Sequence, residues 1–304
     1  MANSSGLNRT GVLSRVTVAA ITAALVGTTT AAVAAEAPQP VSSGIARTSN
    51  ASAFAATTTA VSAPVNYLLG VNSAGTVWAY EPVGGGAIQR LADNSGTGWN
   101  YHSKFAQADL DGDGHSDGWY AIRNGRLNFV DTGAPRDLGG GWNIYNKIVS
   151  ASNTGGGAAD DILARDTSGV LWHYLGYGNG ALTTRYKVGG GWNAYNQIAG
   201  KGDLTGDGRP DLVARDGSGV LWLYKGTGNY KAPFTTRTRI GAGWNTYNLL
   251  TSSGDLNFDG KADIVARNSA GELWLYKGTG NASAPLSARV KIGTSGWNSF
   301  RELF

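Results

Sequence analysis

The sequence predicts an all-β fold, a five-bladed β-propeller. Three repeated elements support this fold class: Gly-Trp-Asn recurs five times, Trp-x-Tyr four times outside those segments, and an acidic nine-residue loop three times. The Gly-Trp-Asn tryptophans lie 43 to 53 residues apart, at Trp99, Trp142, Trp192, Trp244 and Trp297. A repeat of this length that contains several short strands is typical of propeller blades.

The unit that begins at Trp192 shows the strands of one blade most clearly. Its segments alternate between apolar and polar residues, or are short and apolar, and Gly-rich turns separate them. These patterns are typical of half-buried strands and of the turns between them. The predicted strands are 192–198, 212–215, 220–224 and 235–240. Four strands in roughly fifty residues match one propeller blade.

The two ends of the repeat region complement each other. The first unit begins near Val65 with a segment, 66–71, that corresponds to the second strand of the other units. It has no Gly-Trp-Asn segment and no acidic loop before it. The C-terminal segment 296–304 is a Gly-Trp-Asn strand that is not followed by the other three strands of a unit. We therefore expect the C-terminal strand to pair with the first blade and close the ring, which leaves only short, protected sheet edges.

Tryptophan is abundant, with ten residues, and nine of them belong to the two aromatic markers. The Trp-x-Tyr marker supplies Trp78, Trp172, Trp222 and Trp274. Large aromatic side chains fill the tapered space between propeller blades, so we expect both markers to pack there. The alternative is that some of these rings stack on sugars. Three arginines also recur just before turns, Arg165, Arg215 and Arg267, where ion pairs with neighbouring Asp residues are expected.

The acidic loops occupy residues 109–117, 203–211 and 255–263. Each has oxygen-bearing side chains at loop positions 1, 3, 5 and 9, and Gly at position 6. A hard cation such as calcium takes six to eight oxygen ligands from a tightly turned loop of this kind. The expected side-chain ligands are Asp109, Asp111, Asp113, Asp117, Asp203, Thr205, Asp207, Asp211, Asp255, Asn257, Asp259 and Asp263. The backbone carbonyls of His115, Arg209 and Lys261 would supply position 7.

The alternative for these loops is that Asp and Gly only form turns at the rim of the propeller. Calcium is the better explanation, because several carboxylates close together repel one another unless a cation lies between them. The loop is not an EF-hand, since it lacks a Glu at position 12. The loop of the third unit, 153–161, has lost the ligands at positions 3 and 5, so no ion is expected there. A fold that tolerates one ion-free loop suggests a structural role for calcium.

The N-terminal region is expected to be a leader followed by a linker. Residues 1–35 contain Arg9 and Arg15, then an apolar stretch, then Ala32-Val-Ala34. These are the parts of a secretory signal peptide; a retained membrane anchor is the alternative. Residues 36–64 are rich in Ala, Ser, Thr and Pro, which predicts a flexible linker or a removable pro-segment before the propeller, residues 65–304. The processed protein is expected to be secreted and to have no membrane span.

The composition restricts the possible partners and chemistry. The chain has no cysteine, so stability must come from blade packing, ring closure and metal rather than disulfides. Its net charge of +4 falls to +2 without Arg9 and Arg15, which is too weak to predict nucleic-acid binding. The histidines are His102, His115 and His173. None lies in a catalytic motif, so the sequence predicts a non-catalytic protein.

Two resemblances extend this interpretation. The acidic loops followed by Leu-Val-Ala-Arg-Asp, residues 212–216, resemble the FG-GAP or VCBS-type repeats of secreted bacterial propellers, and this resemblance implies calcium in the loops. Residues 240–250 and 292–304 resemble the tachylectin repeat, which implies a five-bladed lectin for N-acetylated sugars. The expected partner is therefore a carbohydrate or cell-wall polysaccharide. The alternative function is a protein-interaction propeller that engages a secreted or surface protein.

Overall fold

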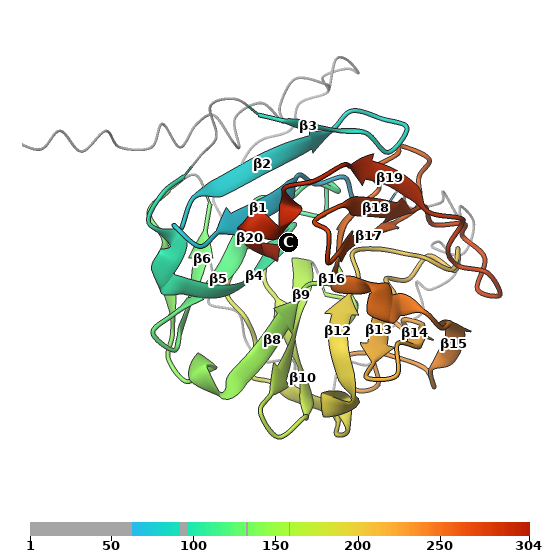
Figure 1. Cartoon of the computed structure of the whole chain (residues 1–304). Helices are drawn as coiled ribbons and strands as arrows, with labels where there is room; N and C mark the ends of the chain where they lie inside the picture. The colour runs from blue at the N-terminus through green and yellow to red at the C-terminus, as the bar shows by residue number, and fades with distance from the viewer. Residues whose placement is uncertain (1–62, 92–95, 132, 158) are drawn as a thin grey trace, which may run out of the picture.

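A computed structural model of the chain describes residues 63–91, 96–131, 133–157 and 159–304. Five sheets, each of four antiparallel strands, are arranged around a central axis (Figure 1). The structure confirms the predicted all-β, five-bladed propeller. The predicted signal peptide, residues 1–35, lies outside the described residues, as does the predicted linker, residues 36–64, except for Ala63 and Pro64. No helix in the described part of the chain is long and apolar enough to cross a membrane.

Each blade runs from an inner strand near the axis to an outer strand at the rim, as Figure 1 shows for β12 to β15. Blade I consists of β20 (Phe300–Leu303), β1 (Leu68–Asn72), β2 (Val77–Pro82) and β3 (Ile88–Arg90). Blade II consists of β4 (His102–Ala108), β5 (Gly118–Arg123), β6 (Arg126–Val130) and β7 (Arg136–Gly139). Blade III consists of β8 (Tyr145–Val149), β9 (Ala159–Asp166), β10 (Leu171–Gly176) and β11 (Tyr186–Gly189).

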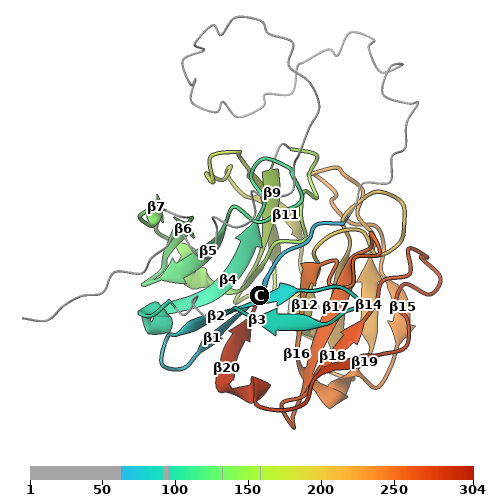
Figure 2. The ribbon, with the colours of Figure 1, turned by 90° about the horizontal axis from the view of Figure 1, so that it is seen from above.

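Blade IV consists of β12 (Tyr195–Ala199), β13 (Leu212–Asp216), β14 (Leu221–Tyr224) and β15 (Thr238–Gly241). Blade V consists of β16 (Tyr247–Gly254), β17 (Asp263–Asn268), β18 (Leu273–Tyr276) and β19 (Val290–Gly293). Strands of these two blades stand side by side when the molecule is turned by 90° (Figure 2). The predicted number of strands per blade is therefore confirmed.

The Gly-Trp-Asn segments are short 3-10 helices, not the starts of strands. The predicted strand 192–198 was wrong at its beginning, because Trp192–Ala194 forms the 3-10 helix η3 and β12 starts only at Tyr195. Gly191 precedes it with a φ of 83°, a left-handed conformation that glycine adopts without strain. The other copies are η1 (Trp99–Tyr101), η2 (Trp142–Ile144), η4 (Trp244–Thr246) and η5 (Trp297–Ser299). The motif therefore turns the chain from the rim of one blade into the inner strand of the next.

The C-terminal strand closes the ring, as predicted. Strand β20 pairs with β1 in antiparallel register, with Gly70 opposite Leu303. The amide of Phe304 donates to the carbonyl of Leu69, and the amide of Leu69 donates to the carbonyl of Phe304, both at 2.9 Å. The C-terminus accordingly lies near the axis beside β20 and β1 (Figure 1).

The hydrophobic core is divided into five clusters, and each cluster spans two adjacent blades. In one of them, Trp244 and Tyr247 of blade V pack with Val213 and Leu221 of blade IV. The tryptophans of four Gly-Trp-Asn segments are at most 8% exposed: Trp142, Trp192, Trp244 and Trp297. This confirms that the first aromatic marker packs between blades, where burial of large rings stabilises the ring of sheets.

The recurring arginines connect neighbouring blades, so the expectation that they form ion pairs with Asp was wrong. Arg267 of blade V donates through Nη1 to the carbonyls of Trp297, at 2.9 Å, and Phe300, at 2.6 Å, in blade I. Arg165 and Arg215 reach the corresponding carbonyls of the next blade in the same way. At the junction of blades I and II, Arg301 takes this role by binding the carbonyls of Trp99 and His102. The adjacent residues Asp166 and Asp216 were misleading, because the partners of Arg165 and Arg215 are backbone atoms about thirty residues away.

Candidate metal loops

The acidic loops connect the inner strand of a blade to its second strand. Loop 109–117 joins β4 to β5, loop 203–211 joins β12 to β13, and loop 255–263 joins β16 to β17. Because the strand order of every blade is the same, the three loops emerge from equivalent places in blades II, IV and V. Each loop is therefore attached to its blade in the same way.

The carboxylate at loop position 1 organises each loop. Asp109 accepts hydrogen bonds from the amides of Asp111 at 3.2 Å and Gly112 at 2.6 Å through Oδ1, and from Gly114 at 2.8 Å through Oδ2. Asp203 and Asp255 accept the equivalent amide hydrogen bonds in their own loops. The loop backbone therefore wraps around this carboxylate, in the manner of a metal-binding turn.

The carboxylate at position 9 closes the loop. Asp117 accepts from the amide of Leu110 at 2.7 Å, and Asp211 and Asp263 accept from the equivalent amides at 3.0 Å. The second oxygen of Asp211 accepts from the amide of Gly226, and that of Asp263 from the amide of Gly278, both at 2.9 Å. In blades IV and V this carboxylate therefore joins the loop to the next hairpin of its own blade.

The structure brings some of the predicted ligands together and leaves others apart. Asp109, Asp111 and Asp117 each place one carboxylate oxygen within 4.8 Å of the others. The position-5 residue Asp113 is not in this cluster. Its Oδ1 accepts from the amide of His115 at 2.8 Å. Asp207 and Asp259 make the same contact with the amides of Arg209 and Lys261. The position-5 side chains thus shape the turn at position 7.

Position 3 differs among the loops. In place of Asp111, the loop of blade IV has Thr205, whose hydroxyl donates to Asp203 at 3.4 Å. The loop of blade V has Asn257, whose Nδ2 donates to both carboxylate oxygens of Asp263, at 3.1 and 3.2 Å. The two ends of an Asn amide are assigned from hydrogen bonding, and rotation by 180° would direct its oxygen toward the same place. Both residues therefore offer an oxygen ligand.

The electrostatics of the loops favour a cation. Burial raises the pKa of Asp211 to about 7, and the nearby carboxylates of Asp203 and Asp207 add to the effect. Burial likewise raises the pKa of Asp263 to about 7, with smaller contributions from Asp255 and Asp259. A divalent ion would stabilise the ionised form of all these groups. The oxygen donors and their crowding therefore fit a hard cation such as calcium.

Without calcium, the protein is expected to lose stability as the pH rises from about 4 to about 7. Asp titrates near pH 3.9 in an unfolded chain, whereas the pKa of Asp211 and of Asp263 is about 7 in the fold. A carboxyl group with a raised pKa binds its proton more tightly in the folded state. Its contribution to stability is therefore present at low pH and lost as the pH passes through the folded pKa.

Melting temperatures of the calcium-free protein at pH 5.5 and pH 8 measure this effect. The lower pH should give the higher value, and the double variant Asp211→Asn/Asp263→Asn should remove most of the difference. The same pH dependence in the double variant would contradict the assignment to these two carboxyl groups.

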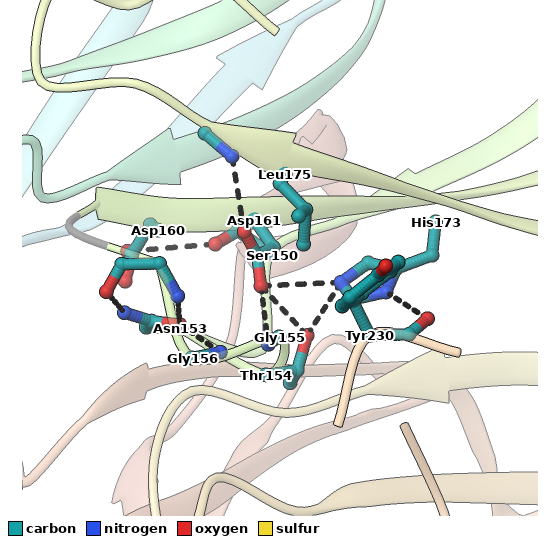
Figure 3. Close-up of polar contacts among 12 residues, drawn as sticks. Ser150, Asn153, Thr154, Gly155, Gly156, Asp160, Asp161, His173, Leu175 and Tyr230 are labelled. Atoms are coloured by element: carbon teal, nitrogen blue, oxygen red, sulfur yellow. Dashed lines mark hydrogen bonds and ion pairs between the residues drawn. The ribbon is translucent and has the colours of Figure 1, made fainter. Parts of the chain in front are cut away.

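The equivalent loop of blade III is built differently (Figure 3). Its position-9 residue, Asp161, is fully buried and accepts from the amide of Gly155 at 2.6 Å and the hydroxyl of Thr154 at 3.2 Å. His173 is also fully buried, and its Nε2 lies 3.1 Å from Oδ2 of Asp161 and 2.9 Å from the hydroxyl of Thr154. Its Nδ1 lies 3.4 Å from the carbonyl oxygen of Tyr230. Both ring nitrogens of His173 therefore face hydrogen-bond partners.

His173 occupies a position that is Leu223 in blade IV and Leu275 in blade V. A Cβ atom on Gly155, at loop position 3, would lie 2.2 Å from Leu175 and 3.1 Å from the His173 ring. The space that a position-3 ligand uses in other blades is therefore filled in blade III. A histidine side chain lies against the closing carboxylate there, which explains how the loop can fold without an ion.

Replacing this histidine should destabilise the protein to the same extent with and without calcium. The variant His173→Leu leaves the buried carboxylate of Asp161 without its hydrogen bond to the imidazole, which costs about 1–3 kcal/mol for a buried polar group that loses a partner. Urea unfolding in excess calcium and in chelator measures the loss. A loss that disappears when calcium is added would show that an ion binds in blade III, contrary to the prediction.

The second aromatic marker forms a cluster with cations in blades III, IV and V. In blade IV, Nε1 of Trp222 donates to Asp216 at 2.7 Å, and the guanidinium of Arg237 lies 4.1 Å from the centre of its ring. Arg185 lies over Trp172 at 4.1 Å and Arg289 over Trp274 at 4.2 Å. These tryptophans are only partly buried, so they belong both to the packing between blades and to the surface.

A cavity of about 350 Å³ lies among the loops of blades II, III and IV. Its lining includes Pro64, Asp109, Asn153, Asp160 and Arg209. The Nζ atom of Lys201, which is buried, forms an ion pair with Asp160 and donates to the carbonyl of Gln107 at 3.0 Å. This ion pair could not be predicted from the repeats, because no repeated marker contains Lys201.

Comparison with known proteins identifies one repeat family. A family model described as an FG-GAP-like repeat matches residues 203–266, which include the acidic loops of blades IV and V. The chain thus contains an FG-GAP-like repeat within a five-bladed propeller. No curated protein matches the sequence.

Several solved structures resemble the chain at low identity. Regucalcin from Agrobacterium tumefaciens, described as a calcium-binding protein, is 13% identical, with 78% of this chain and 80% of regucalcin covered and a TM-score of 0.42. A triple Arg-to-Ala mutant of AofleA from Arthrobotrys oligospora is 12% identical, with 77% and 73% covered and a TM-score of 0.42. A protein of unknown function from Bacteroides caccae is 9% identical, with 74% and 72% covered and a TM-score of 0.38.

Proposed function

We propose that this chain is a secreted, non-catalytic propeller that binds carbohydrate and is stabilised by calcium in blades II, IV and V. The calcium part of the proposal is supported by the three equivalent loops, by the carboxylates that crowd in them, and by the FG-GAP-like repeat across two of them. The carbohydrate part depends on the surface of the blades.

One observation carries the carbohydrate proposal: three adjacent blades present the same partly exposed tryptophan beside fixed polar groups. In blades III and IV, the indole donates to a carboxylate, Asp166 at 2.8 Å and Asp216 at 2.7 Å. An indole offers an apolar surface for a sugar ring, and neighbouring carboxylates and guanidinium groups can bind hydroxyls. Equivalent weak sites on one rigid molecule would increase the affinity for a polymeric glycan through multivalency.

The histidines support a binding role rather than catalysis. His173 and Asp161 form a hydrogen-bonded pair, but both side chains are 0% exposed and so cannot contact a substrate. His102 is buried, and Nδ1 of His115 is bonded to the carbonyl of Val65 at 2.9 Å. None of these side chains is paired with an accessible nucleophile in the described part of the chain.

The test is binding of residues 36–304 to an array of glycans and bacterial polysaccharides, in calcium and in chelator, with circular dichroism as a check on folding. Binding that free sugar competes away would support the proposal. A blank array with calcium-loaded, folded protein would overturn it. Capture of a defined protein partner together with a blank array would support the alternative, a protein-interaction propeller.

A further inference from the structure

Positive and negative residues are unevenly distributed along the chain, although its net charge is small. Residues 171–304 run from β10 of blade III, through blades IV and V, to β20 of blade I. They include fifteen Lys and Arg but nine Asp and Glu. Residues 63–170 have seven Lys and Arg but eleven Asp and Glu. The cations therefore gather on one side of the ring, and calcium in the loops of blades IV and V would increase that positive charge.

The outer edges of blades III, IV and V carry these cations in a regular pattern. Each outer edge has two exposed cations separated by one residue. In all three blades the second cation is the register partner of the partly exposed tryptophan. The pairs are Arg185 and Lys187, Arg237 and Arg239, and Arg289 and Lys291. These six residues together form the basic rim.

The first cation of each pair is held in place. Arg185 donates through Nη1 to the hydroxyl of Tyr145 at 2.9 Å, and Arg289 donates to Tyr247 at 2.6 Å. Arg237 donates to the hydroxyl of Tyr195 in the same way. Each guanidinium also stacks on its tryptophan, as described above. A guanidinium group has five N–H donors, so donors remain for a carboxylate or phosphate after the tyrosine is bound.

The other two blades lack this feature. In blade II, the cations of the outer hairpin are already paired, Arg126 with Asp137 at 2.6 Å and Arg136 with Asp131 at 3.2 Å. The outer edge of blade I has a single arginine, Arg90, over Trp78. Among the described residues of the basic rim, only Lys291 has an ion-pair partner, Glu272. Among the described residues, two exposed cations beside a partly exposed tryptophan are thus found together on the outer edges of three adjacent blades.

We propose that the basic rim binds an acidic polysaccharide, with successive carboxylate or phosphodiester groups of one polymer on the cation pairs of successive blades. This inference rests on the proposed function and specifies its ligand class. Guanidinium groups that are already fixed lose little conformational freedom when they bind planar anionic groups. Repetition over three blades suits a polymer, because each additional contact is intramolecular once the first has formed.

The test is binding of calcium-loaded residues 36–304 to hyaluronate, to poly(glycerol phosphate) and to neutral dextran of similar length. The variant Lys187→Glu/Arg239→Glu changes the basic rim without touching the tyrosine-bound arginines. The variant Arg123→Glu/Lys231→Glu makes the same change in charge at exposed cations outside the rim. We expect one or both acidic polymers to bind, with an affinity that falls as salt is added. The rim variant should lose about tenfold or more in affinity, and the control variant about twofold or less.

Three results would overturn the inference but not the proposed function. The first is an equal loss in the rim and control variants, which would indicate binding to charge in general. The second is binding of double-stranded DNA as tight as that of either acidic polymer. The third is competable binding to neutral glycans alone, which would leave the proposed carbohydrate function intact and remove only the ligand class. A protein that binds no glycan of any kind would overturn both proposals.

Discussion

A chain that ends before Gly296 is expected to lose the cooperative unfolding of the propeller. The deletion removes η5 and β20, and with them the strand that closes blade I. Four large apolar side chains leave the core, each at most 8% exposed in the intact fold: Trp297, Phe300, Leu303 and Phe304. Burial of one such side chain contributes about 1.5–3 kcal/mol, whereas the net stability of a domain is about 5–15 kcal/mol. The loss is therefore comparable with the whole stability of the fold.

Urea unfolding followed by tryptophan fluorescence measures this effect. A graded variant, Phe304→Ala, keeps the strand but removes the ring that stacks on Phe105 at 4.9 Å. It should fold and lose about 3–5 kcal/mol, as large-to-small core substitutions do. A truncated chain that remains monomeric and unfolds cooperatively at nearly the same urea concentration would contradict the role assigned to ring closure.

Removal of calcium is expected to lower the melting temperature by about 15 °C or more. An ion present at a hundredfold excess over its dissociation constant contributes about 2.7 kcal/mol to stability at each site, or about 8 kcal/mol for three sites. For a domain of this size, each 1 kcal/mol shifts the melting temperature by about 2–4 °C. Differential scanning calorimetry in calcium and in chelator measures the difference.

A pair of matched variants locates the effect in the loops. Asp203→Asn removes the carboxylate that organises the loop of blade IV, so the response to calcium should fall by about a third, as one of three equal sites is lost. Asp161→Asn changes a loop carboxylate of blade III, where no ion is expected, so it should leave the calcium response unchanged whatever it does to stability. A calcium response that falls equally in both variants would contradict the assignment of ions to blades II, IV and V.

The repeats made the fold predictable from sequence, because each marker identifies one blade. The first unit lacks a Gly-Trp-Asn segment and the C-terminus has an additional one, which predicts ring closure by residues 296–304. The boundary of the inner strand could not be predicted, because alternation of apolar and polar residues over 192–198 does not distinguish a strand from a 3-10 turn that leads into one. Similarly, the partners of Arg267 are backbone carbonyl groups. Every residue has one, so the residue types could not identify these partners.

The candidate site was only partly predictable. The positions of Asp109, Asp111 and Asp117 in the loop identified the carboxylates that come together, but position 5 was assigned from the pattern alone, and Asp113 faces the turn instead. The role of His173 had a signal: it stands where the copies in blades IV and V have a leucine. The basic rim had a signal as well, the repeated Arg-x-Lys/Arg before Val/Ile-Gly at 185–189, 237–241 and 289–293. Its meaning could not be predicted, because only the ring arrangement brings these outer edges to one side.

The most direct test is the number of calcium ions that one chain binds. Native mass spectrometry of residues 36–304, equilibrated with calcium and then desalted, counts the ions that remain bound. The predicted result is three per chain, two in Asp203→Asn and three in Asp161→Asn. A chain that retains no calcium, or that loses an ion in Asp161→Asn but none in Asp203→Asn, would contradict the account of the loops.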